Sequence, residues 1–163
     1  PNNKNSFMAA DQAAEVADIP VAVVPTKTIS QGMTAMLAFN DQQSLEENKA
    51  TMTEMIESVV SGQVTTAVRD TTIDNVEIKK DDYLGMIDGK IVVSEPDMAK
   101  ASLDTLKRMI DEDTEIVTII VGEGGTMKEA EQFAEALTAE FEDLETELHE
   151  GGQPVYPYLF SAE

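Results

Sequence analysis

One glycine-rich stretch of the sequence has the composition of a phosphate-binding loop. Gly122-Glu123-Gly124-Gly125-Thr126 separates a β-branched apolar run from an amphipathic run, so it should join a buried strand to a helix. Free N–H groups and the helix dipole at such a junction can hold a phosphate. The stretch lacks the Walker lysine and the dinucleotide spacing, and Glu123 puts negative charge where the anion would lie. We therefore interpret Gly122, Gly124 and Gly125 as residues of a tight strand-to-helix turn.

A second candidate site is the loop Pro25-Thr26-Lys27-Thr28. It follows an expected strand at 19–24, and open α/β sheets bind ligands at the carboxyl ends of their strands. Lys27 could hold an anionic group there. The alternative needs no ligand, because Pro25 can stop the strand while Thr28 or Ser30 caps the next helix.

The single histidine is the remaining candidate for catalysis. His149 alternates with Glu145 and Glu147 on an expected strand, beside Glu150. A proton relay is one interpretation, and a solvated side chain on an acidic strand is the preferred one. With no cysteine and one histidine, the sequence excludes disulfides, thiolate nucleophiles and multi-histidine metal sites. We predict no catalytic residue and no metal ligand.

The excess of carboxylates is the strongest feature of the composition. The 163 residues contain 32 Asp and Glu against 11 Lys and Arg, a formal charge of −21. Such a chain is repelled by nucleic-acid phosphates and by anionic lipid, which leaves basic partners, cations or simple solubility. No Lys or Arg follows Lys128, so the acidity is concentrated in the last helix and the tail. The candidate partner-binding residues are Glu129, Glu131, Glu135, Glu142, Glu145, Glu147 and Lys27.

The elements that must position these residues alternate between helix and strand. Asp88-Gly89 between β-branched runs predicts a tight hairpin within an antiparallel insert at about 70–94. The alternation predicts a layered α/β sandwich with a mixed sheet, in which the two tail strands pair through their short loop. Helices are expected from Asn3 onward, at 30–40, from Ser44 to Ser61-Gly62, after Asp97 and after Gly125, and strands at 19–24, 63–71, 115–121, 144–149 and 155–161.

Four methionines lie on two successive expected helices. Met33, Met36, Met52 and Met55 all fit inward-facing helical stripes. Methionine is common both in cores and at adaptable docking surfaces, and we favour the core here.

Length and hydropathy indicate one domain over residues 1–163. Hydrophobic residues make up 42% and charged residues 26%, which is enough to form a packed core despite the charge. No apolar run reaches the 18 residues of a membrane span. The N-terminus has neither an initiator methionine nor a signal-peptide pattern, so we expect a fragment of a longer cytoplasmic protein.

In their order along the chain, several motifs together resemble one known family. The sequence is similar throughout to the C-terminal domain of the bacterial fatty acid kinase subunits of the FakA family, which is related to dihydroxyacetone kinases and to DegV proteins. One loop departs from the family pattern, because Gly122-Glu123-Gly124-Gly125 stands where a charged loop is expected. The motifs that carry the resemblance are residues 1–5, 9–17, 23–33, 66–71, 78–92 and 151–161.

The resemblance implies a fold of the DegV, FakB and dihydroxyacetone kinase type, and a non-catalytic role. The domain would dock a FakB-type fatty acid carrier while an N-terminal domain, absent from this chain, uses ATP and Mg²⁺ to phosphorylate the acyl carboxylate for phospholipid synthesis. The implied partners are that carrier and the remaining domains of the same kinase, with no cofactor in this chain. Residues matching the family's fold signatures are Pro25, Thr26, Thr28, Gly32, Gly151, Gly152, Gln153 and Pro154.

Two other functions stay open. The domain could itself hold a fatty acid or a small phosphorylated molecule in a crevice near Lys27 and Gly122. It could also be a purely structural domain of the kinase.

Overall fold

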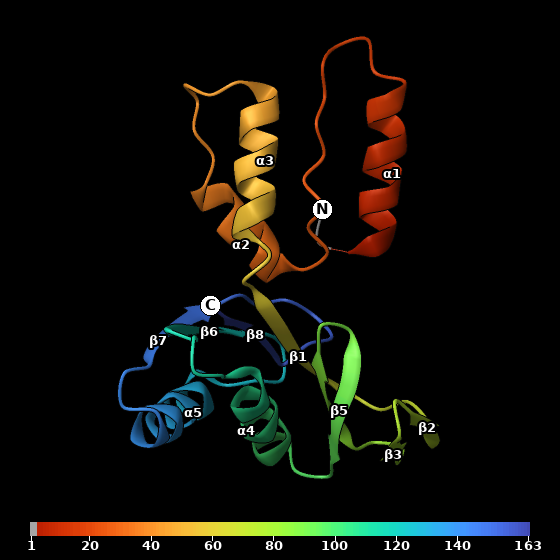
Figure 1. The fold of residues 1–163 in the computed structure, drawn as a ribbon. Helices are drawn as coiled ribbons and strands as arrows, with labels where there is room; N and C mark the ends of the chain where they lie inside the picture. The colour runs from red at the N-terminus through yellow and green to blue at the C-terminus, as the bar shows by residue number, and fades with distance from the viewer. Residues whose placement is uncertain (1–2) are drawn as a thin grey trace. The chain divides into compact units, whose positions relative to one another are not determined.

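The chain forms two compact units, residues 1–59 and residues 60–163. The computed structural model describes residues 3–163, so Pro1 and Asn2 of the first motif lie outside the described residues. Each unit is described by itself below, with the elements labelled as in Figure 1. That both units serve one carrier-binding domain stays a prediction.

The N-terminal unit contains the helices α1 (Lys4–Glu15), α2 (Ile29–Leu37) and α3 (Leu45–Met55). Side chains cap all three, as the sequence indicates. Asn3 Oδ1 accepts the Ser6 N–H at 2.8 Å, and Thr28 caps α2. At α3, Ser44 and Glu47 form the expected capping box. The predicted end of this last helix at Ser61-Gly62 is wrong, because α3 ends at Met55 and both residues lie in a strand.

The strand predicted at residues 19–24 is not formed within residues 3–163. A strand persists only when another segment pairs with its N–H and C=O groups. Pro20 and Pro25 bring no N–H of their own, and the Thr26 N–H bonds back to the nearby Val24 carbonyl at 2.8 Å. Val21 is 44% exposed. The β-branched composition was therefore a poor guide, because pairing is a non-local property.

The C-terminal unit is built on a six-stranded mixed sheet in the order β5-β4-β1-β8-β6-β7. Only β6 and β7 are parallel, and each remaining pair is antiparallel. The predicted pairing of the two tail strands is wrong, because β6 lies between β7 and β8. The strands are β1 (Val60–Thr66), β4 (Tyr83–Ile87), β5 (Lys90–Glu95), β6 (Ile116–Val121), β7 (Glu145–Glu150) and β8 (Tyr158–Ala162).

Helices α4 (Met98–Met109) and α5 (Met127–Glu140) lie on the same side of this sheet (Figure 1). Side chains alternate along each strand, so one set from every central strand faces the helices. These side chains and the helix stripes form a single apolar core. Its members include Val64, Leu106, Ile119, Leu137, Tyr158 and Phe160, all with 0% exposure.

Two tight hairpins connect antiparallel strands. Asp88 and Gly89 have φ of 47° and 82°, so the predicted turn between β4 and β5 is confirmed. A second turn of the same kind joins β2 (Thr71–Ile73) to β3 (Val76–Ile78), with φ of 52° at Asp74 and 64° at Asn75. The predicted insert therefore divides, since β2 and β3 form a separate hairpin while β4 and β5 extend the main sheet.

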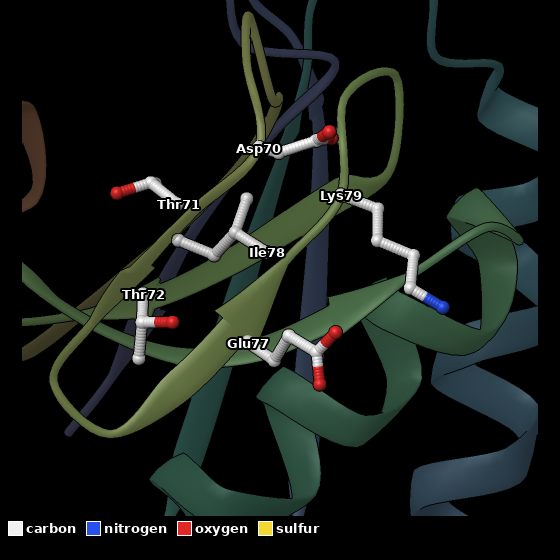
Figure 2. A pocket seen from close by; sticks show the side chains of 6 residues that line it. All are labelled: Asp70, Thr71, Thr72, Glu77, Ile78 and Lys79. Carbon is white, nitrogen blue, oxygen red and sulfur yellow. The ribbon is translucent and has the colours of Figure 1, made fainter.

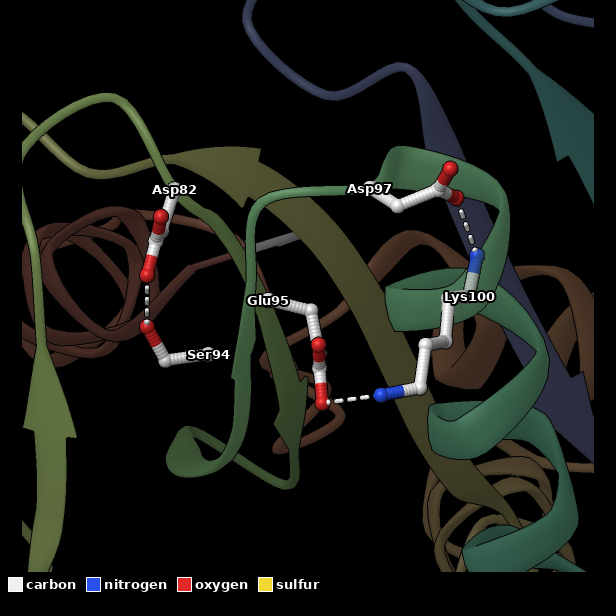
Figure 3. A network of polar contacts seen from close by, with 5 residues as sticks. All are labelled: Asp82, Ser94, Glu95, Asp97 and Lys100. Carbon is white, nitrogen blue, oxygen red and sulfur yellow. Dashed lines mark hydrogen bonds and ion pairs between the residues drawn. The ribbon is translucent and has the colours of Figure 1, made fainter.

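Polar contacts fasten the start of α4 to the neighbouring strand (Figure 3). Asp97 caps the helix by accepting the Lys100 N–H at 2.8 Å. The Lys100 ammonium bonds Glu95 Oε1 at 2.6 Å, and this contact raises the pKa of Lys100. Ser94, one residue earlier on β5, donates to Asp82 at 3.1 Å. The helix start predicted after Asp97 is confirmed.

Candidate functional site

Two loops meet at the carboxyl ends of the parallel strands β6 and β7. We call residues 122–126 and 151–157 together the loop junction. The Glu123 N–H donates to the Gln153 carbonyl oxygen at 2.9 Å, which joins one loop directly to the other. The structure thus brings together two glycine motifs that the sequence presents 25 to 30 residues apart. Carboxyl ends of parallel strands are the usual position of binding sites in α/β sheets.

Gln153 holds the loop junction in place. Its Nε2 donates to the Ile120 carbonyl at 3.2 Å and to the Tyr156 carbonyl at 3.1 Å. These two acceptors fix the orientation of the amide, and they leave its buried Oε1 without a hydrogen bond. A Cβ atom at Gly151 would lie 2.1 Å from this oxygen, and one at Gly122 would lie 2.5 Å from Nε2. Both glycines are therefore needed for the close approach of the loops.

The glycine-rich loop uses its N–H groups internally. Gly122 donates to the Pro157 carbonyl at 2.8 Å, and Gly125 donates to the Gly122 carbonyl at 3.2 Å. Thr126 donates to the Tyr158 hydroxyl at 2.9 Å. A phosphate site requires such groups to be free and convergent. The geometry fits a tight strand-to-helix turn.

Tyr158 links β8 to the first turn of α5. Its hydroxyl accepts from Thr126 and donates to Glu129 Oε2 at 2.9 Å. Burial of the phenol raises the pKa of Tyr158 to about 12, and the Glu129 carboxylate adds to the rise. The ring also packs edge-on against Phe133, with centroids 5.3 Å apart, and leaves no room for a side chain at Gly125. Tyr158 thus stays a protonated structural donor.

Val155 is the strained residue of the loop junction. Its φ is +74°, a conformation that β-branched residues rarely adopt, and its side chain is 67% exposed. Nothing in the sequence pattern distinguishes it from an ordinary strand residue, and we expected it to begin the last strand. The strand begins three residues later, at Tyr158.

The candidate acidic residues separate into two rows on different elements. Glu131 and Glu135 are exposed on α5, which covers one face of the sheet. Glu145 and Glu147 are exposed on the edge strand β7. Because Leu148 packs against the core beneath the helices, the alternating Glu145 and Glu147 point to the opposite side of the sheet. We call these pairs the α5 row and the β7 row.

The other acidic candidates differ from these rows. Glu129 is half-buried and engaged with Tyr158 and Thr126, whereas Glu142 is exposed in the turn after α5. His149 extends the β7 row, with Nε2 lying 3.4 Å from Glu147 Oε2. Both side chains are about half exposed, at 52% and 56%. This arrangement matches a solvated histidine on an acidic strand.

The loop around Lys27 belongs to the N-terminal unit, whereas Gly122 belongs to the C-terminal unit. The Lys27 N–H donates to Gln31 Oε1 at 2.9 Å, while Thr28 Oγ1 accepts the Gln31 N–H at 3.1 Å. These contacts begin α2, so the loop has the geometry of the capping alternative. The fold-signature residues Pro25 and Thr26 precede this cap, and Gly32 lies in the first turns of α2. Gly152 and Pro154 are exposed in the loop junction.

Helix α2 exposes its apolar face. Met33, Met36 and Leu37 are 46%, 65% and 83% exposed and form what we call the α2 ridge. The inward positions are the small or polar Ser30, Thr34 and Ala35. The prediction that the methionines lie in a core is therefore wrong for Met33 and Met36, and also for Met55 at 42% exposure, while Met52 is half-buried. Helical spacing defines a stripe, but it does not say which side of the helix packs.

A shallow depression lies beside the β2–β3 hairpin (Figure 2). Its side chains point in different directions and do not converge on one position. Asp70 is already engaged, since its Oδ1 accepts the Lys80 N–H at 2.7 Å. The depression therefore lacks the convergent polar groups of a small-molecule site. Its lining residues are Asp70, Thr71, Thr72, Glu77, Ile78 and Lys79.

Metal centres and membrane spans are the two remaining kinds of site. Within residues 3–163 no group of three or more His, Asp or Glu side chains is placed to hold a metal ion. No helix in the same range is both long and apolar enough to cross a bilayer.

Solved structures of DegV-family proteins share this fold. A Thermus thermophilus DegV protein, described by its fatty acid binding, matches with a TM-score of 0.60 at 17% identity, over 98% of this chain and 67% of its own. A Ruminococcus gnavus DegV protein, refined with vaccenic acid, matches with a TM-score of 0.62 at 13% identity, over 98% of this chain and 68% of its own. The chain therefore has a DegV-type α/β fold, as the sequence resemblance implies.

Sequence comparison identifies the family within this fold. The model of the FakA-like C-terminal family of fatty acid kinases matches residues 1–163, so the chain belongs to that family. Protein YloV of Bacillus subtilis is 49% identical over all 163 residues. An uncharacterized protein of Staphylococcus aureus strain USA300 is 45% identical over the same length. The chain spans 30% of the length of each of these relatives.

Proposed function

We propose that this chain is a non-catalytic docking domain of a larger fatty acid kinase. It binds an acyl-carrying protein of the FakB type, and a kinase domain elsewhere in the same polypeptide phosphorylates the fatty acid carboxylate. One observation carries the proposal. A member of this kinase family presents, after Lys128, ten carboxylate residues and no Lys or Arg.

The physical basis of docking is electrostatic steering. A one-signed surface accelerates the encounter with a partner of opposite charge, and salt removes that advantage. The β7 row is the better contact of the two, because it lies on an edge strand and continues into the loop junction at Gly151. The α5 row contributes long-range attraction only. Charged side chains on an edge strand also discourage unspecific strand pairing.

The geometry of the loop junction supports a non-catalytic role. The N–H groups that could hold a nucleotide phosphate are bonded within the loops, and Tyr158 keeps its proton at neutral pH. We therefore assign ATP and Mg²⁺ binding to the part of the kinase outside this chain, and place the whole protein in the cytoplasm.

Direct fatty acid binding by this chain is the second candidate function. The DegV fold favours it, because two of the solved relatives are described by their fatty acids. The exposed α2 ridge adds an apolar surface that an acyl chain could contact. Native mass spectrometry of the purified chain separates the two proposals, since a retained lipid mass would favour this second function. If the chain can be deleted without loss of kinase activity or carrier binding, its role is structural only.

The docking proposal is tested by titrating the purified chain with an oleate-loaded DegV-family carrier from the same genome. We expect affinity that falls as salt is raised from about 20 to about 200 mM, because the Debye length shortens over this range. Glu145→Gln with Glu147→Gln should weaken binding more than Glu131→Gln with Glu135→Gln, although both variants lose two charges. No binding at low salt would overturn the proposal, and equal losses would overturn the assignment to β7.

A further inference from the structure

Val155 has a backbone conformation that its side chain opposes. Five residues other than glycine have positive φ within residues 3–163, and four of them are Asp or Asn in turns. Asp and Asn tolerate this region because their short polar side chains bond locally. Valine has no such compensation, and its two branches crowd the backbone. Strain of this kind persists only where the surroundings over-determine the conformation, and it concentrates at functional sites.

The neighbours of Val155 impose the strained conformation. On one side, the Gln153 carbonyl accepts from Glu123, and Pro154 has a fixed φ. On the other side, the Tyr156 carbonyl accepts from Gln153 Nε2 at 3.1 Å. The Val155 carbonyl itself accepts from Thr65 Oγ1 at 3.3 Å. The chain is therefore held on both sides of Val155.

The Val155 side chain contributes nothing to the interior. It is 67% exposed and belongs to neither apolar cluster. Glycine or asparagine would support the same backbone with less strain. A valine at this position is thus unfavourable for the fold, and its methyl groups are available only to a molecule outside the chain.

The charges around Val155 specify what that molecule is. Glu123 and Glu150 are exposed in and beside the loop junction, and no cation follows Lys128 in the sequence. Anionic lipid is repelled by such a surface. A protein surface with a small apolar depression bordered by Lys and Arg complements it.

We infer that Val155 is the apolar anchor through which the loop junction contacts the basic surface of the acyl carrier. The strained loop presents the side chain, and the surrounding carboxylates orient the partner. This inference rests on the proposed docking function and adds the residue that makes the central contact.

The test uses two readouts that a structural role would move together. We expect Val155→Gly and Val155→Asn to raise the midpoint of thermal unfolding, because the strain is relieved. The same variants should raise the Kd for the oleate-loaded carrier about tenfold, because the anchor is lost. Val68→Gly is the matched control, since Val68 is 84% exposed in ordinary backbone, and it should leave the Kd unchanged.

The possible outcomes separate this inference from the proposed function. Unchanged carrier binding by both Val155 variants would overturn the anchor while leaving docking intact. A lower unfolding midpoint together with weaker binding would also overturn it, because the residue would then act through the fold. Retention of the wild-type chain on phosphatidylglycerol vesicles, lost on Val155→Asn, would replace the protein partner with a membrane. If the wild-type chain fails to bind the carrier at low salt, the proposed function itself fails.

Discussion

Tyr158 donates its phenolic hydrogen to the Glu129 carboxylate, 2.9 Å away, although the two residues lie on a strand and a helix separated by 29 positions. The same hydroxyl accepts the Thr126 N–H at the N-terminal end of α5. A strand residue thus takes part in capping a helix. The contact joins β8, the loop junction and α5 in one hydrogen-bonded unit.

Replacing Tyr158 with phenylalanine should test the energetic value of this unit. Tyr158→Phe leaves the Thr126 N–H without its acceptor in a part-buried contact, so we expect a loss of about 1–3 kcal/mol in the free energy of unfolding. Urea unfolding followed by circular dichroism measures it. Tyr83→Phe, in β4 and outside the network, is the control, and an equal loss in both variants would refute a specific role for the contact.

The raised pKa of Tyr158 predicts a loss of stability at alkaline pH. The folded protein holds the phenolic proton up to about pH 12, whereas the unfolded chain releases it near the ordinary pKa of 10.0. Between these values the unfolded state binds fewer protons, so the free energy of unfolding falls as pH rises. Lysines titrate in the same window, so the comparison is between wild type and Tyr158→Phe. The difference between them should shrink from pH 10 to pH 12, and a constant difference would contradict the shift.

The close approach at Gly151 predicts a large effect from one methyl group. A Cβ there would lie 2.1 Å from Gln153 Oε1 and 2.4 Å from Ile120 Cγ2, so Gly151→Ala should cost about 1–3 kcal/mol. Gly32→Ala in α2 is a matched control of opposite sign. No atom lies within 4 Å of the new methyl there, and alanine favours a helix by about 0.5–1 kcal/mol. Thermal unfolding of both variants decides whether crowding or loop flexibility explains Gly151.

The exposure of the α2 ridge predicts that a large leucine can be removed at little cost. Leu37 is 83% exposed, so Leu37→Ala should change the free energy of unfolding by less than about 0.5 kcal/mol. Leu137→Ala, at 0% exposure in α5, should cost about 2–5 kcal/mol. Comparable costs at the two positions would mean that the α2 ridge is covered in solution.

Local chemistry made part of this fold predictable. The caps at Asn3, Ser44 and Asp97 and the Asp88-Gly89 turn each depend on residues within four positions of one another. Their outcome is decided by side chains that satisfy nearby N–H groups or tolerate positive φ. Sequence patterns of this kind transfer directly to structure.

Features that depend on distant segments were not predictable in the same way. Residues 19–24 have strand composition but no partner in the described chain, and the tail strands are separated by β6. The outward orientation of Met36 depends on what packs against the other side of α2. At the candidate site, the glycines were recognised, but their contact through Gln153 and the strain at Val155 arise only when two distant loops meet.

The position of β8 between β1 and β6 has a consequence for biosynthesis. Val64 pairs with Tyr158 on one side of β8, and Val121 pairs with the same residue on the other side. The two halves of the sheet therefore cannot join until β8, the last strand in chain order, has left the ribosome. Until then each half exposes an unpaired strand and part of the apolar core, a state that attracts chaperones and favours aggregation. Completion of the sheet is a late event with a high contact order, which slows folding.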